Sequence, residues 1–173
     1  LRIDLFGIFC SLIYATLLFL FVWATKQTTA ANAIFLQYTA PIYILILAPF
    51  VIGEKFHWRD LVTVAFCIAG MSLFFVGDLS VGDIRGNIAA LGSGIFLGLY
   101  IMLLKHPRAI GGERPLNPAI TVIYGNFVLA LATLPNGIEA VSTVTSKDLF
   151  AVAWLGIFQI GVSYIFFIKG VRG

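Results

Sequence analysis

Six uncharged apolar segments dominate this sequence and leave few folds open to it. None of them contains Asp, Glu, Lys or Arg, and they cover roughly residues 5–25, 33–52, 61–77, 86–104, 119–135 and 149–168. A helix that crosses a bilayer requires about 17 to 25 mostly apolar residues. Short links that carry the charges, and in one case Gly111-Gly112, Pro115 and Pro118, separate the segments. The pattern predicts an all-α membrane protein with six transmembrane helices.

The composition excludes a soluble domain of ordinary type. The chain is 60% hydrophobic and 11% charged, whereas soluble domains carry about 25% charged residues. A chain of 173 residues cannot hide so much apolar surface in a single soluble core. Helices lying on a membrane surface are disfavoured, because the segments lack a polar face. The lipid bilayer is therefore the expected surrounding of an integral membrane protein.

The positive charges predict how the chain is oriented. Because successive links alternate between the two sides of the membrane, the cations can be assigned to faces. One face carries Arg2, Lys55, Arg59, Lys105, Arg108, Arg114, Lys169 and Arg172, and the other carries Lys26, Arg85 and Lys147. The positive-inside rule makes the first face cytoplasmic, so that residue 1 lies on the cytoplasmic side. This topology explains the net charge of +3, with phosphate binding as the weaker alternative and no nucleic-acid partner expected.

Two stretches of the chain resemble each other and are expected to face opposite ways. Asp4-Leu-Phe-Gly-Ile8 begins the first segment, and Asp148-Leu-Phe-Ala-Val152 begins the sixth. In the topology above, Asp4 is cytoplasmic and Asp148 is external. A repeat of opposite orientation is typical of inverted-repeat transporters, and chance similarity is the alternative.

Several motifs occur in an order that points to one family. A segment begins with Thr29-Ala-Ala-Asn-Ala33, has Pro41 near its middle and ends at Gly53-Glu54. The next segment carries Ala69-Gly-Met71, and the fourth opens with Arg85-Gly-Asn-Ile-Ala-Ala-Leu91. This order resembles the EamA repeat of the drug/metabolite transporter superfamily. The resemblance implies a ten-helix inverted-repeat (5+5) bundle, with these six spans as its third to eighth helices.

The same resemblance divides the chain. Residues 1–80 would be the C-terminal part of a first EamA repeat, helices 3–5, and residues 84–173 the N-terminal part of a second, helices 6–8. The family's third helix runs outward from the cytoplasm, in agreement with the distribution of Lys and Arg. Because the sequence starts at Leu1 without an initiator Met and stops just after an apolar run, we expect a truncation at both ends, with helices 1, 2, 9 and 10 missing.

The expected function is membrane transport rather than catalysis. The resemblance implies a transporter of a bacterial inner membrane, exporting small metabolites such as amino acids by alternating access around a midplane cavity. A channel or a structural membrane protein is the alternative. An intramembrane enzyme is less favoured, because no span contains the His, Asp, Glu or Lys that would activate Ser93 as a nucleophile. No cofactor is expected, and His57 and His106 lack the companion ligands of a metal site.

The second segment supplies the sharpest candidates for contact with a small-molecule substrate. Pro41 removes a backbone donor from the helix interior and frees the carbonyl of Gln37. Gln37 shares its helical face with small residues, as a cavity wall requires, and Tyr38 lies at the edge of that face. The alternatives are a packing kink at Pro41 and an interhelical hydrogen bond of Gln37 worth about 1 kcal/mol.

A second group of candidates lies in the sixth segment. Gln159 and Ser163 are one turn apart, with Tyr164 beside them. If the sixth segment mirrors the first, this group approaches the same cavity as Tyr14. Packing within the bundle is the alternative for each residue.

Gly94 and Gly98 form a small-residue stripe that lets helices approach closely. We expect this stripe to pack within the fold, and a homodimer contact is the alternative.

Overall fold

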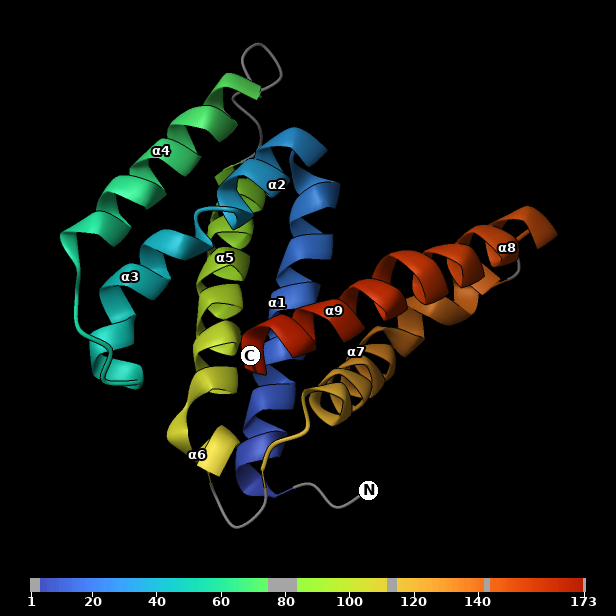
Figure 1. Ribbon diagram of the computed structural model, residues 1–173. Coiled ribbons are helices and arrows are strands. Elements are labelled where there is room, and N and C mark those ends of the chain that lie inside the picture. The colour runs from blue at the N-terminus through green and yellow to red at the C-terminus, as the bar shows by residue number, and fades with distance from the viewer. Residues whose placement is uncertain (1–3, 75–83, 112–114, 142–143, 173) are drawn as a thin grey trace. The chain divides into compact units, whose positions relative to one another are not determined.

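The computed structural model describes the backbone of residues 4–74, 84–111, 115–141 and 144–172. Within these ranges the secondary structure is helical and contains no strand (Figure 1). The helices are α1 (Leu5–Gln27), α2 (Ala30–Gln37), α3 (Ala40–Val51), α4 (Trp58–Phe74), α5 (Ile84–Lys105), α6 (Pro107–Gly111), α7 (Pro118–Val141), α8 (Ser146–Trp154), a π-helical segment (Leu155–Val162) and α9 (Ser163–Arg172).

The predicted all-α membrane class is confirmed. Among the described residues, three stretches are long and apolar enough to cross a membrane: Leu5–Gln27, Ala30–Val51 and Ile84–Lys105. Pro118–Leu134 is a shorter apolar helix. The total of six spans and the ten-helix inverted repeat stay predictions.

The chain forms two compact units, residues 1–129 and residues 130–173. In the first unit α1 and α5 pack along each other, and α2 and α3 lie against α5 (Figure 1). Small side chains make these contacts close. A core cluster is formed by Ala24, Ala33, Ala89 and Ala90, with Leu20, Phe21 and Leu36 packed against it.

The first part of α7 joins the first unit through a glycine and a hydroxyl pair. An ideal Cβ on Gly125 would lie 2.7 Å from Cδ1 of Tyr14 and 2.8 Å from the carbonyl oxygen of Ser11, so only glycine fits without a shift. The hydroxyls of Tyr100 and Thr121 are 2.9 Å apart and buried, which ties α5 to α7. Interhelical hydrogen bonds of this kind and small residues are what hold membrane helices together.

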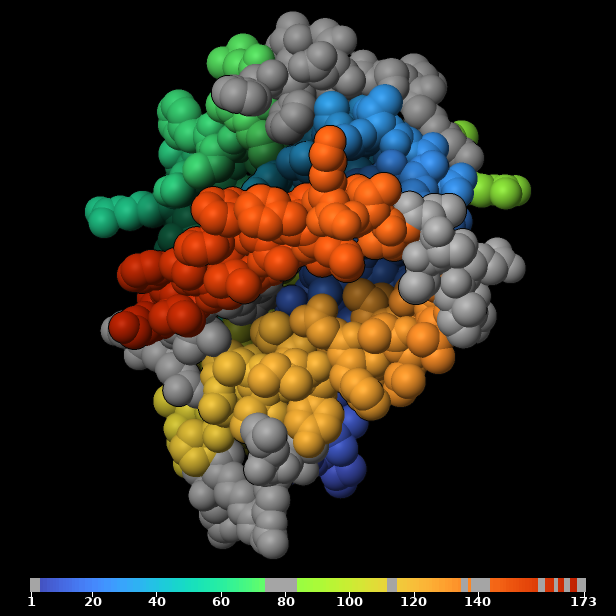
Figure 2. Space-filling model, turned by 90° about the vertical axis from the view of Figure 1, so that its right-hand side faces the viewer, coloured from blue at the N-terminus to red at the C-terminus, as the bar shows by residue number. Residues whose placement is uncertain are grey.

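The second unit contains the rest of α7 and the α8–π–α9 rod. Figure 2 shows the described side chains of α8 and α9 as one continuous band in orange and red. The rod begins with a capping box: the Thr145 backbone N–H donates to the Asp148 carboxylate at 2.9 Å, and the Asp148 N–H donates to the Thr145 hydroxyl oxygen at 3.3 Å. Such a box satisfies donors that a helix start leaves unpaired.

Candidate functional site

The apolar helix that carries Gln37 and Pro41 is broken. α2 ends at Gln37, Tyr38 and Thr39 form a turn, and α3 begins at Ala40. Within the turn the Thr39 N–H donates to the Leu36 carbonyl at 3.3 Å, and the Thr39 hydroxyl donates to the same oxygen at 2.6 Å. The hydroxyl thus supplies a second and shorter hydrogen bond to this carbonyl at the break, where backbone groups need partners in lipid.

Pro41 accounts for the position of this break. It is the second residue of α3, where its missing N–H is tolerated. In a continuous helix that N–H would bond to the Gln37 carbonyl, and the ring would clash with the same carbonyl. The predicted disturbance by Pro41 is therefore present, and it falls over the two residues Tyr38 and Thr39 that precede α3. Pro49 lies inside α3 without ending it.

The break packs onto two glycines of α5. An ideal Cβ on Gly94 would lie 2.9 Å from the carbonyl oxygen of Gln37 and 3.2 Å from that of Leu36. A Cβ on Gly98 would lie 3.3 Å from the carbonyl oxygen of Ala40. The predicted small-residue stripe thus serves packing within the fold, where it brings the backbone of α5 against the carbonyls at the break.

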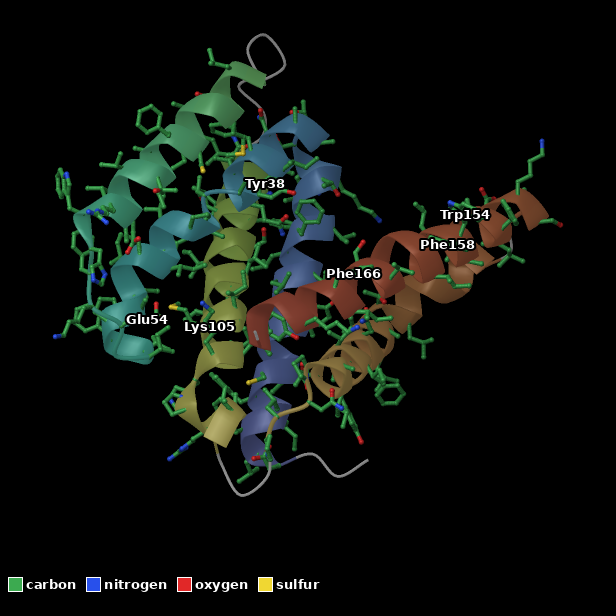
Figure 3. The ribbon with its side chains drawn as sticks, in the orientation of Figure 1. Tyr38, Glu54, Lys105, Trp154, Phe158 and Phe166 are labelled. Carbon is green, nitrogen blue, oxygen red and sulfur yellow. The ribbon has the colours of Figure 1, made fainter. Side chains whose placement is uncertain are left out.

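A groove extends from Pro41 toward the link between α3 and α4. Its volume is about 290 Å³, and it is lined by Pro41, Ile44, Leu45, Ala48, Glu54, Lys55, Phe56, Asp60 and Val64. The lining residues from Pro41 to Ala48 belong to α3, so the groove runs along this helix, and Figure 3 labels Glu54 just after its end. The end near Pro41 is apolar and the other end carries charge, an arrangement able to take up a small amphipathic molecule.

Glu54 lies at the charged end of this groove, one residue after Gly53. Gly53 has a φ of +71°, a left-handed conformation that glycine adopts without strain, and it ends the helix with a sharp turn. Glu54 forms no ion pair with Lys55 or Arg59, although all three residues are described; nearby, His57 Nδ1 and Asp60 Oδ2 lie 3.8 Å apart.

The candidate residues fall into separate groups. Gln37, Tyr38 and Pro41 lie together at the break, where Gln37 is half-buried and Tyr38 is 55% exposed. Tyr14 is only 3% exposed and its ring lies against Tyr100, with 5.1 Å between ring centroids. Tyr14 thus occupies the contact between α1, α5 and the start of α7.

The candidates of the sixth segment surround a second irregular stretch of backbone. Gln159 belongs to the π-helical segment, and Ser163 is exposed and begins α9. The side chains of Gln159 and Tyr164 lie outside the described part of the structure. π-helical turns are rare and occur frequently at functional sites.

A polar cluster at the other end of α5 was missed by sequence reasoning. The Thr28 hydroxyl donates to Asn87 Oδ1 at 3.0 Å, and Asn32 Nδ2 donates to Thr28 Oγ1 at 3.1 Å. Asn32 is 4% exposed. The spacing of Thr28 and Asn32, four residues apart at a helix start, was the available signal. Nothing in the sequence pointed to Asn87 as their partner, because that contact spans 59 residues.

Comparison with known proteins shows a similarity to one family. The sequence pattern of the EamA-like transporter family matches residues 2–76. The matched residues contain α1 to α4, and therefore the α2–α3 break and the groove beside it. The resemblance to EamA-type members of the drug/metabolite transporter superfamily is confirmed.

A curated relative supports the same conclusion over more of the chain. An "Uncharacterized transporter" of Clostridium kluyveri is 25% identical over 156 residues, which are 87% of this chain and 50% of that protein. The chain thus spans about half the length of the curated relative that it matches. No solved structure matches the chain. Together with the apolar helices, these similarities support an integral membrane protein.

Proposed function

We propose that the complete protein exports small metabolites, such as amino acids, across a bacterial inner membrane with residue 1 on the cytoplasmic side. It does so by alternating access, as the two halves of an inverted-repeat bundle rock around a midplane cavity. The α2–α3 break carries this proposal, because irregular backbone at membrane depth is tolerated only where protein buries it or where it lines a cavity.

The proposed substrate contacts follow from the break. Gln37 offers an amide and Tyr38 a hydroxyl, while Pro41 borders the groove beside α3. Tyr14, Gln159, Ser163 and Tyr164 complete the proposed set. Binding would then rest on hydrogen bonds and apolar contacts, since the predicted spans contain no charged residue. Coupling through a carboxylate within these spans is not part of the proposal.

A transport assay with defined probes tests this function. The complete protein is reconstituted into liposomes, and uptake of each of a panel of radiolabelled L-amino acids is measured with and without the unlabelled compound inside. A transporter gives saturable uptake. The unlabelled compound inside accelerates this uptake, because the binding site then returns to the outside loaded with substrate rather than empty. Linear uptake without counterflow would instead support a pore, the second candidate function.

A preliminary screen narrows the panel. Cells that overproduce the complete protein are grown in inhibitory concentrations of single amino acids and related metabolites. An exporter raises the tolerated concentration of its own substrates only. Equal growth of producing and non-producing cells on every compound would remove amino acids from the proposal.

A further inference from the structure

The glycine face of α5, formed by Gly94 and Gly98, meets the α2–α3 break at backbone atoms rather than at side-chain tips. The atoms nearest to an ideal Cβ on Gly94 are the Gln37 carbonyl oxygen at 2.9 Å, the Leu36 carbonyl oxygen at 3.2 Å and the Gln37 Cα at 3.4 Å. A Cβ contact below 3.0 Å is essentially never found in proteins. Because a backbone oxygen cannot swing aside like the end of a flexible side chain, a side chain on Gly94 would displace the break itself.

The same contact bears on the carbonyl that Pro41 leaves without a donor. The Gln37 oxygen would bond to the N–H of residue 41 in a continuous helix, and proline has none. Carbonyl groups without a partner are costly at membrane depth. Glycine lets α5 come close enough for its Cα–H groups to face this oxygen, and Cα–H groups are weak hydrogen-bond donors at helix–helix interfaces. The break is thus supported by α5 from outside the helix that it interrupts.

We propose that Gly94 is a positioning residue that holds the α2–α3 break against α5 and so fixes the orientation of Gln37. Gly98 has the same role for the first turn of α3. It is a weaker one, because an ideal Cβ there would lie 3.3 Å from both the Ala40 oxygen and Ile44 Cγ1. The role of Gln37 in binding substrate rests on the proposed function, whereas the positioning does not. Since both glycines contact α2 and α3 of the same chain, packing within the fold already occupies this face.

Thiol labelling tests the positioning without any substrate. In the complete protein, Cys67→Ser removes the exposed thiol, and Cys10 is kept because its side chain is 0% exposed. Gln37→Cys then introduces a reporter at a half-buried position. Its rate of reaction with N-ethylmaleimide in proteoliposomes is measured by mass spectrometry. A variant without Gln37→Cys gives the background from Cys10.

Three glycine substitutions on the same helix are compared in this background. Gly94→Ala is expected to raise the labelling rate about tenfold, because overpacking pushes the break off α5. Gly98→Ala is expected to raise it about threefold. Gly92→Ala is the matched control: its Cβ would meet only Cδ1 of Leu20, at 3.3 Å, and that flexible tip can move. The control should leave the rate unchanged.

The ranking of the three variants decides the proposal. Equal labelling of Gly94→Ala and Gly92→Ala would overturn it, and so would an equal increase in all three, which would mean general loosening of α5. If Gly94→Ala prevents folding, Gly98→Ala against Gly92→Ala decides in the same way. A confirmed ranking, combined with no transport of any labelled amino acid by the unsubstituted protein, would retain the positioning and remove amino acids from the proposed function.

Discussion

The α2–α3 break and the π-helical segment interrupt two apolar helices in different ways. At the break the helix stops, the Thr39 hydroxyl donates to the Leu36 carbonyl, and a new helix starts. In the π-helical segment, Leu155–Val162, the chain continues from α8 into α9 with a wider turn. Pro41 follows the break as the second residue of α3. Residues 155–162 contain no proline, and they contain two glycines, Gly156 and Gly161.

This difference shows what each interruption needs in order to persist. Proline removes a hydrogen bond outright, so we expect the break to depend mainly on Pro41, while α5 fixes its geometry. A π-helical turn keeps its hydrogen bonds in an i→i+5 register, so an α-helical alternative with equally satisfied groups is always available. We therefore expect substitutions in neighbouring helices to shift the position of the break without restoring a continuous helix, and the π-helical segment to change its register in response to single substitutions.

Pro41→Ala should have the largest effect, because it attacks the cause of the break. The change restores an N–H for the Gln37 carbonyl and removes about 3 kcal/mol of proline penalty for a continuous helix. We expect α2 and α3 to join through Tyr38 and Thr39, and the export proposed above to be lost. Hydrogen exchange of a peptide covering residues 36–42 should slow, and counterflow should disappear.

Pro49→Ala is the matched control for this experiment. Pro49 also lies in α3, but the helix runs through it to Val51, so its removal should change neither exchange at residues 36–42 nor transport. If exchange at residues 36–42 stays fast in Pro41→Ala, then contacts with α5 maintain the break, and proline is not its cause.

Gln37 and Gln159 allow the contributions of the two interruptions to substrate binding to be compared. Gln37→Leu and Gln159→Leu each remove an amide that is proposed to bond to substrate. Loss of a bond worth about 1 kcal/mol in membrane lowers the affinity about fivefold. We expect this loss in the KM of counterflow for both variants, with unchanged amounts of protein in the membrane. Gln27→Leu, at the exposed end of α1, should leave the KM as it is.

Unequal results would sharpen the comparison. If only Gln37→Leu raises the KM, the break belongs to the site and the π-helical segment is a packing feature. If Gln37→Leu instead lowers the amount of protein and leaves the KM unchanged, the amide joins helices and does not bind substrate.

The sequence predicted the cause of the break more reliably than its surroundings. Pro41 acts through its own covalent structure, so its effect was predictable from one residue. The identity of the helix that packs against the break was not predictable. Gly94 lies 57 residues from Gln37, and a contact between residues so far apart in the sequence depends on the packing of the whole unit. For the same reason the Thr28–Asn87 bond and the place of Tyr14 beside Tyr100 escaped prediction.

The π-helical segment escaped prediction for a different reason. Its residues, Leu155–Val162, form an ordinary apolar run, and the choice between α and π registers rests on small differences that no local motif signals. The sequence analysis singled out Gln159 and Ser163, the amide and the hydroxyl of this stretch, and their contact with substrate stays a prediction. Their pattern carries information on polarity but none on the width of the helical turn.

Gly161→Ala should have a smaller effect, confined to the π-helical segment. A Cβ on Gly161 would lie 3.2 Å from the carbonyl oxygen of Gly156, the residue five positions earlier. The mild overpacking, on the order of 1 kcal/mol, favours a return to the α register. Carbonyl carbon shifts in solid-state NMR would report the change. Gly156→Ala is the control, since nothing lies within 4 Å of its Cβ position, and equal shifts in both variants would contradict this explanation.

Acidification should have the smallest effect and should leave both interruptions intact. The hydroxyl of Thr145 and then its backbone N–H donate to the Asp148 carboxylate, and these bonds lower the pKa of Asp148 below its ordinary value of 3.8. Because the folded pKa is the lower one, the capping box stabilises α8 above about pH 3.8, and this contribution is lost as the pH falls through the folded value. Hydrogen exchange at residues 146–150, measured relative to the intrinsic exchange rate, should therefore become faster as the pH is lowered from about 5 through the folded pKa of Asp148. The factor should be small because the side chain is exposed.

Asp148→Asn is the control for this prediction. It keeps an acceptor oxygen but cannot titrate, so the exchange rate of residues 146–150 relative to the intrinsic rate should not depend on pH. An acid response that persists in Asp148→Asn would assign the titration to a different group.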